Sequence, residues 1–131
     1  MSSLLLLPTL LRQSPRSAKI AVLTFDSTRL TEDMLGIEDP TERSRIVIGG
    51  IEGSKYWHDE QKRPPPPVDR AAVERDVPAC LARVRAAHPD IAVILFECTG
   101  FPRVAPAIRH STKLPVYDIT TLCRLTYASV A

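Results

Sequence analysis

Cysteine, glycine and net charge are all scarce in this sequence of 131 residues. The three cysteines are widely spaced and form no CxxC pair, so neither a disulfide framework nor a zinc site is predicted. The five glycines match neither GxGxxG nor the phosphate-binding P-loop pattern. A net charge of +2 does not indicate a strongly basic nucleic-acid binder. We therefore expect an intracellular protein with free thiols, no metal and no nucleic-acid partner.

The N-terminal apolar stretch, residues 4–11, is too short to span a membrane, so no membrane partner is expected. Its apolar residues indicate an ordinary amphipathic helix. The basic residues Arg12, Arg16 and Lys19, with several serines and no acid before Asp26, also match the composition of a mitochondrial presequence. A cytoplasmic location is predicted, with a mitochondrial one as the alternative.

Four apolar segments predict short strands: residues 19–25, 45–51, 91–96 and 114–119. Helices are predicted between them, including one from 26–28 through Leu35 and one over 68–88 that Pro78 should kink. This alternation predicts an α/β fold, a three-layer α-β-α sandwich with a mainly parallel sheet of about four strands. The length predicts one domain over residues 1–131.

Residues 54–67 are predicted to form a proline-rich loop within this domain, because four consecutive prolines end the segment. Such a run adopts polyproline conformation. It can serve as a stiff spacer or can dock in an aromatic groove, and the spacer is the simpler interpretation. Tyr56 and Trp57 of this segment could cover a site.

The strand at 91–96 ends in Glu97, Cys98, Thr99 and Gly100, which makes this strand end the main candidate site. Ligands of open α/β sheets bind beyond the carboxyl ends of parallel strands. A helix start after Cys98 should favour its thiolate, which can act as base or nucleophile. The alternative is that Cys98 simply packs, as most cysteines do. Glu97 should point away from Cys98.

The hydroxyl residues Thr24, Ser27 and Thr28 follow the first strand and should lie at the same sheet edge. They can contact substrate or cap the next helix. None of the three histidines follows a strand, so a Cys-His hydrolase is not predicted.

The motif Phe96-Glu-Cys-Thr-Gly100 and the downstream segments 107–109 and 114–122 together resemble the second catalytic segment of the aspartate/glutamate/hydantoin racemase superfamily. Segments 21–28 and 46–53 are similar to its middle region, so the resemblance covers nearly the whole chain. It implies an isomerase without cofactor, built from two α/β domains that each supply a cysteine. Residues 1–131 would correspond to the second domain.

The resemblance implies that Cys98 is the thiolate acid/base for the proton on the carbon next to a carboxylate or hydantoin carbonyl. Thr99 and Gly100, with Thr24, Ser27 and Thr28, are then the candidate substrate-binding residues. The expected substrate is an amino acid, a hydantoin or a related carboxylate.

Neither Cys80 nor Cys123 can supply the second catalytic thiol that this family uses, because both are predicted within helices. Three functions follow. The chain is a racemase-like protein that is incomplete without a first domain or a homodimer partner. Alternatively, it is a non-catalytic binding or oligomerisation module, with exposed apolar surface on its first and last helices, or a single-thiol enzyme of decarboxylase type.

Overall fold

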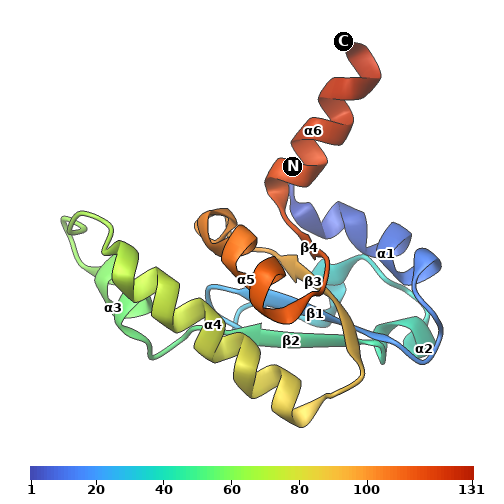
Figure 1. Ribbon diagram of the computed structural model, residues 1–131, viewed down its shortest axis with the longest axis horizontal. Helices are drawn as coiled ribbons and strands as arrows, with labels where there is room; N and C mark the ends of the chain where they lie inside the picture. The colour runs from blue at the N-terminus through green and yellow to red at the C-terminus, as the bar shows by residue number, and fades with distance from the viewer.

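A computed structural model describes all 131 residues, and its centre is a four-stranded sheet (Figure 1). The strands are β1 (Lys19–Thr24), β2 (Ile46–Gly50), β3 (Ile91–Phe96) and β4 (Val116–Tyr117). Their order is β2-β1-β3-β4, and every neighbouring pair is parallel. The predicted parallel α/β fold is therefore confirmed, although the fourth strand is only two residues long.

Helical segments connect and cover the strands. Three are 3-10 helices, η1 (Ser3–Leu6), η2 (Glu32–Leu35) and η3 (Pro102–Val104). The α-helices are α1 (Leu7–Gln13), α2 (Pro40–Arg43), α3 (Lys55–Gln61), α4 (Arg70–Ala87), α5 (Ala105–Thr112) and α6 (Ile119–Val130). Not one of them has both the length and the apolar character to cross a membrane.

Alternation along the central strands builds one apolar cluster on each face of the sheet. Leu23, Ile94 and Phe96 pack with buried residues of α4 and α5. Val22 and Leu95 point the other way and pack with leucines of α1. Each such side chain, when fully buried, contributes about 1.5–3 kcal/mol to the free energy of unfolding. Helices on both faces give the three-layer arrangement that the sequence predicts.

Two connections differ from the prediction. The expected helix after β1 is replaced by a turn in which the Asp26 carboxylate accepts hydrogen bonds from the backbone N–H and hydroxyl of Thr28, and only η2 remains helical. The predicted loop at 54–67 begins with the helix α3, whose start is capped when Ser54 Oγ accepts from Trp57 N. The four prolines follow this helix. α4 continues through Pro78 as one helix.

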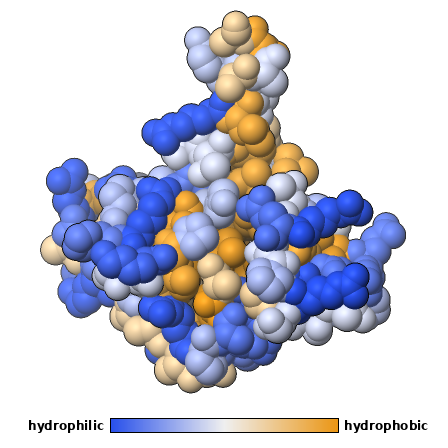
Figure 2. Space-filling model, turned by 45° about the vertical axis from the view of Figure 1, so that its right-hand side comes forward, coloured by the Kyte–Doolittle hydropathy of each residue, from blue (hydrophilic) through white to orange (hydrophobic).

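The helix α6 projects from the body of the molecule (Figure 1). Its first turn is capped by Asp118 and packed through Leu122, but Leu125, Tyr127 and Val130 are exposed. Figure 2 shows hydrophobic side chains along this projection. The first helix differs from the expectation of apolar exposure, because most of its leucines lie in the core.

Candidate functional site

Cys98 lies in a tight turn directly after β3. Phe101 N donates to the carbonyl oxygen of Cys98 at 3.2 Å, which closes the turn before η3. Gly100 N donates to Cys98 Sγ at 3.4 Å. The side chain is half-buried and faces an open depression, so the thiol is anchored and yet accessible.

The depression beside Cys98 is built by three parts of the chain. Its floor is the turn after β3, one wall comes from α3 and the residues that follow it, and Phe25 closes it from the end of β1. The lining residues are Phe25, Tyr56, Glu60, Gln61, Arg63, Cys98, Thr99 and Gly100. The structure therefore brings Thr99 and Gly100 together with Cys98, as predicted.

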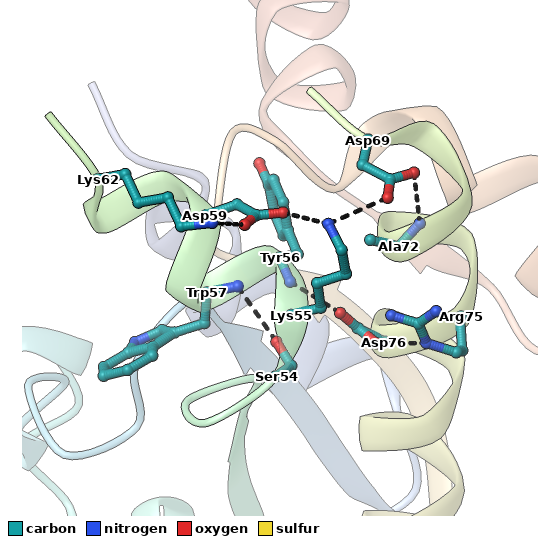
Figure 3. A network of polar contacts seen from close by, with 10 residues as sticks. All are labelled: Ser54, Lys55, Tyr56, Trp57, Asp59, Lys62, Asp69, Ala72, Arg75 and Asp76. Carbon is teal, nitrogen blue, oxygen red and sulfur yellow. Dashed lines mark hydrogen bonds and ion pairs between the residues drawn. The ribbon is translucent and has the colours of Figure 1, made fainter. Parts of the chain in front are cut away.

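A polar network fixes the wall that α3 contributes (Figure 3). Tyr56 N donates to Asp76 Oδ2 of α4 at 2.9 Å. Lys55 bridges Asp59 of its own helix and Asp69, which in turn caps α4 through Ala72 N. These contacts tie α3 to α4 at several points, so the position of the wall is defined by α4.

Tyr56 and Gly100 meet closely at the edge of the depression. Tyr56 is buried, and a Cβ added at Gly100 would overlap its hydroxyl oxygen. Only glycine allows this approach. Burial raises the pKa of Tyr56, and the neighbouring Cys98 and Glu60 raise it further. The phenol therefore stays protonated and can donate a hydrogen bond beside the thiol.

Aromatic rings from β1 and α3 pack against one another at this wall. Phe25 meets Tyr56 edge-on, with ring centroids 6.2 Å apart, and stacks on Trp57 at 6.4 Å. Of the two expected cover residues, Tyr56 lines the depression, from a helix and not from a loop, whereas Trp57 does not line it and stacks on Phe25. Phe25 and Glu60 were not among the predicted site residues.

Of the two charged residues that line the depression, Arg63 binds backbone carbonyl groups and Glu60 has no charged partner. Arg63 Nη1 donates to the carbonyl oxygens of Glu60 and Lys62, so the guanidinium turns back onto the end of α3. The carboxylate of Glu60 makes no ion pair. The depression thus holds one acidic side chain without a charged partner.

The thiol of Cys98 is not activated in the way that the sequence predicts. Burial raises its pKa above 9.0, and the charges of Glu97 and Glu60 add to this effect, while the backbone N–H groups of Gly100 and Phe101 oppose it. The expected helix start also lies further on, because the turn leads first into the short η3. The prediction of a thiolate favoured in the free chain is therefore wrong, because a half-buried thiol loses solvation.

The three hydroxyl residues of the β1 loop are bound to carboxylates of the chain. Thr24 Oγ1 donates to Glu97 Oε2 at 2.7 Å, and Ser27 binds Glu52 through both its N–H and its hydroxyl. Thr28 binds Asp26. None of the three lines the depression at Cys98. A direct role in substrate binding stays a prediction for them.

The other sulfur and imidazole groups lie elsewhere. Cys80 is buried in the core, where burial raises its pKa to about 11, and Cys123 is exposed on α6. No histidine lines the depression. No three His, Cys, Asp or Glu side chains gather as a metal site would need.

Comparison with known proteins gives a consistent set of relatives. The chain is 35% identical over 125 residues to a dimethylsulfoniopropionate lyase of Durusdinium sp. clade D, an alignment that covers 90% of this chain and 40% of that protein. It is 31% identical to dimethylsulfoniopropionate lyase 7 of Emiliania huxleyi (strain CCMP1516), over 94% of this chain and 38% of the relative. Dimethylsulfoniopropionate lyase 3 of the same strain is 30% identical, over 99% and 36%.

These relatives are lyases by name. The inferred membership in the aspartate/glutamate/hydantoin racemase superfamily, and with it the function of an amino-acid or hydantoin racemase, is therefore wrong. Of the predicted alternatives, the single-thiol enzyme of decarboxylase type agrees better, because decarboxylases are also lyases. The chain spans about two fifths of the length of these relatives. No family model and no solved structure gives a significant match.

Proposed function

We propose that this chain carries a lyase site that cleaves a sulfonium propionate, with Cys98 as the base. The similarity to dimethylsulfoniopropionate lyases over 90% of the chain carries this proposal. The depression at Cys98 supports it, because it presents one accessible thiol beside groups that can hold a small carboxylate. The substrate class is accordingly a small carboxylate with a cationic leaving group.

The proposed reaction is an elimination. Cys98 Sγ, as thiolate, takes a proton from the carbon next to the carboxylate, and the electron pair of that C–H bond forms a carbon–carbon double bond. The bond between the β-carbon and sulfur breaks, and its electron pair leaves with neutral dimethyl sulfide. Acrylate remains, and the proton stays on Cys98 until solvent removes it. One thiol is sufficient for this step.

Two neighbouring residues are suited to the carboxylate of such a substrate. Thr99 offers a hydroxyl at the rim of the depression, and Tyr56 offers a phenolic O–H next to Gly100. Hydrogen bonds to the carboxylate strengthen as negative charge develops on it during proton removal, so they stabilise the transition state. The raised pKa of Cys98 also means that the rate should increase with pH as the thiolate forms.

The test is release of dimethyl sulfide and acrylate from dimethylsulfoniopropionate, followed by headspace gas chromatography and proton NMR. Cys98→Ser is the active-site variant, and Cys123→Ser, on the projecting α6, is its matched control. We expect release from wild type and Cys123→Ser at equal rates, and only the buffer rate from Cys98→Ser. Equal rates in all three chains, or no release above buffer from wild type, would overturn the proposal.

A further inference from the structure

The leaving group of the proposed substrate is a cation, and one wall of the depression has the composition that binds organic cations. Phe25 and Tyr56 present aromatic rings there, and Glu60 presents a carboxylate. A sulfonium cannot donate a hydrogen bond, so protein groups recognise it through π-faces and negative charge.

Glu60 is positioned to act on the same small volume as the thiol. Its charge raises the pKa of both Cys98 and Tyr56, so its carboxylate lies within electrostatic reach of both groups. It has no ion-pair partner, although Lys55, Lys62 and Arg63 all lie near it in sequence. Lys55 and Lys62 are held by Asp59, and Arg63 caps the end of α3.

The aromatic part of this wall is held in place by the fold. Asp76 fixes the backbone of Tyr56, and the edge-on contact with Phe25 orients the two rings at 89° to each other. A wall that is already ordered loses little conformational entropy when a ligand binds, which favours affinity. Cation–π contacts contribute most where the cation leaves water, as it does against a half-buried ring.

We propose that Phe25, the aromatic ring of Tyr56 and Glu60 form a subsite for the sulfonium end of the substrate and determine the specificity for cationic leaving groups, while the Tyr56 hydroxyl faces the carboxylate end. This subsite rests on the proposed lyase function, because that function supplies the cationic ligand. A sulfonium between Glu60 and Cys98 offsets the charge of Glu60, which together with burial and Glu97 opposes ionisation of the thiol. Binding of the correct substrate and formation of the base are thereby coupled.

The test compares affinities in the Cys98→Ser chain, where no turnover consumes the ligand. The ligands are dimethylsulfoniopropionate and 4-methylpentanoate, which has the same skeleton with an uncharged carbon in place of sulfur. Trp57, the single tryptophan, stacks on Phe25 and reports binding by fluorescence, with calorimetry as a second readout. We expect the sulfonium ligand to bind about tenfold more tightly, or about 1.4 kcal/mol.

Two variants locate this preference. Glu60→Gln and Phe25→Leu should each reduce the ratio of the two affinities severalfold. Glu74→Gln, an exposed glutamate of α4 outside the depression, should leave it unchanged. Equal affinities, no binding of either ligand, or an unchanged ratio in both variants would overturn the subsite. This test measures binding and not turnover. Its outcome therefore does not depend on whether the wild-type chain releases dimethyl sulfide in the earlier test.

Discussion

Two loops leave the sheet at the same edge, and their polar groups are used differently. The end of β1 and the loop after it carry Thr24, Ser27 and Thr28, and each of their hydroxyls is bound to a carboxylate of the chain. The loop after β3 carries Cys98 and Thr99, which line an open depression. Position at the strand ends brings both loops to one edge, but only the second keeps reactive groups free for a ligand.

The two loops are also linked to each other. Thr24 at the end of β1 binds Glu97, the residue that precedes Cys98. The Thr24 hydroxyl, which the sequence predicts to bind substrate or to cap a helix, thus holds the Glu97 carboxylate next to Cys98. The residues after β1 therefore hold the loop after β3 in place. Substitutions can distinguish this structural role from direct contact with a substrate.

The largest effect is expected from Gly100→Ala. The added Cβ would overlap the hydroxyl of Tyr56, which is buried and fixed through its backbone by Asp76, so we expect a loss of about 1–3 kcal/mol in the free energy of unfolding. Urea unfolding measures this loss. The double variant Gly100→Ala with Tyr56→Phe removes the overlapping oxygen and should recover most of it. Equal stability of the single and double variants would contradict this close approach.

Thr24→Val tests the supporting loop. Valine keeps the shape of threonine but leaves the half-buried Glu97 carboxylate without its hydroxyl donor, which should lower the free energy of unfolding by about 1–3 kcal/mol. Thr28→Val, at an exposed hydroxyl bound to Asp26, is the matched control and should cost less. If urea unfolding gives the same loss for both, burial of the Thr24 contact has no energetic consequence.

The thiols provide a comparison by chemistry. We expect iodoacetamide at pH 8 to modify the exposed Cys123 first, Cys98 more slowly because its pKa is raised, and Cys80 last because it is buried. Mass spectrometry of peptides gives the three rates. The rate at Cys98 should increase with pH as the thiolate forms, and Glu60→Gln should increase it at pH 8 because one of the charges that raise the pKa is removed. Fastest labelling at Cys98 near neutral pH would show an activated thiolate instead.

The smallest effect is expected when low pH protonates Asp59 and breaks its ion pair with Lys55 in α3. The ammonium of Lys55 beside Asp59 lowers the pKa of that carboxyl from 3.8 to about 2. This pair therefore stabilises the folded chain above about pH 4, and its contribution is lost as the pH falls through about 2. Trp57 fluorescence should follow this loosening, and Asp59→Asn should lack the same step. Identical acid profiles for the two chains would show that the pair does not hold the wall.

The strands and the position of Cys98 could be predicted because they depend on local pattern. Apolar runs predict the buried strands. The change from apolar to polar residues after Phe96 predicts the end of β3. The parallel arrangement then followed from the alternation with helices, and the structure agrees. Cys80 was likewise predicted within a helix, and it lies fully buried in α4.

The wall of the depression could not be predicted as fully, because it depends on contacts between distant segments. The sequence indicates Tyr56 and Trp57 as a cover, but the following prolines favour a loop where the structure has the helix α3. The capping residue Ser54 and the i,i+4 pair of Lys55 and Asp59 were local signals that could have identified it. Glu60 and Phe25 carry no such signal, since only the folded chain brings them to Cys98.

The projecting α6 has a consequence for local stability. Its first turn is secured by Asp118 and Leu122, but its outer turns hold exposed side chains and few contacts with the body. A helix of twelve residues without packing is marginal in water. The backbone amides beyond Arg124 should therefore exchange with deuterium within seconds. Those of β1 and β3 should exchange only when the whole chain unfolds. We therefore expect a persistent sheet together with a C-terminal helix whose outer turns open many times during one lifetime of the folded sheet.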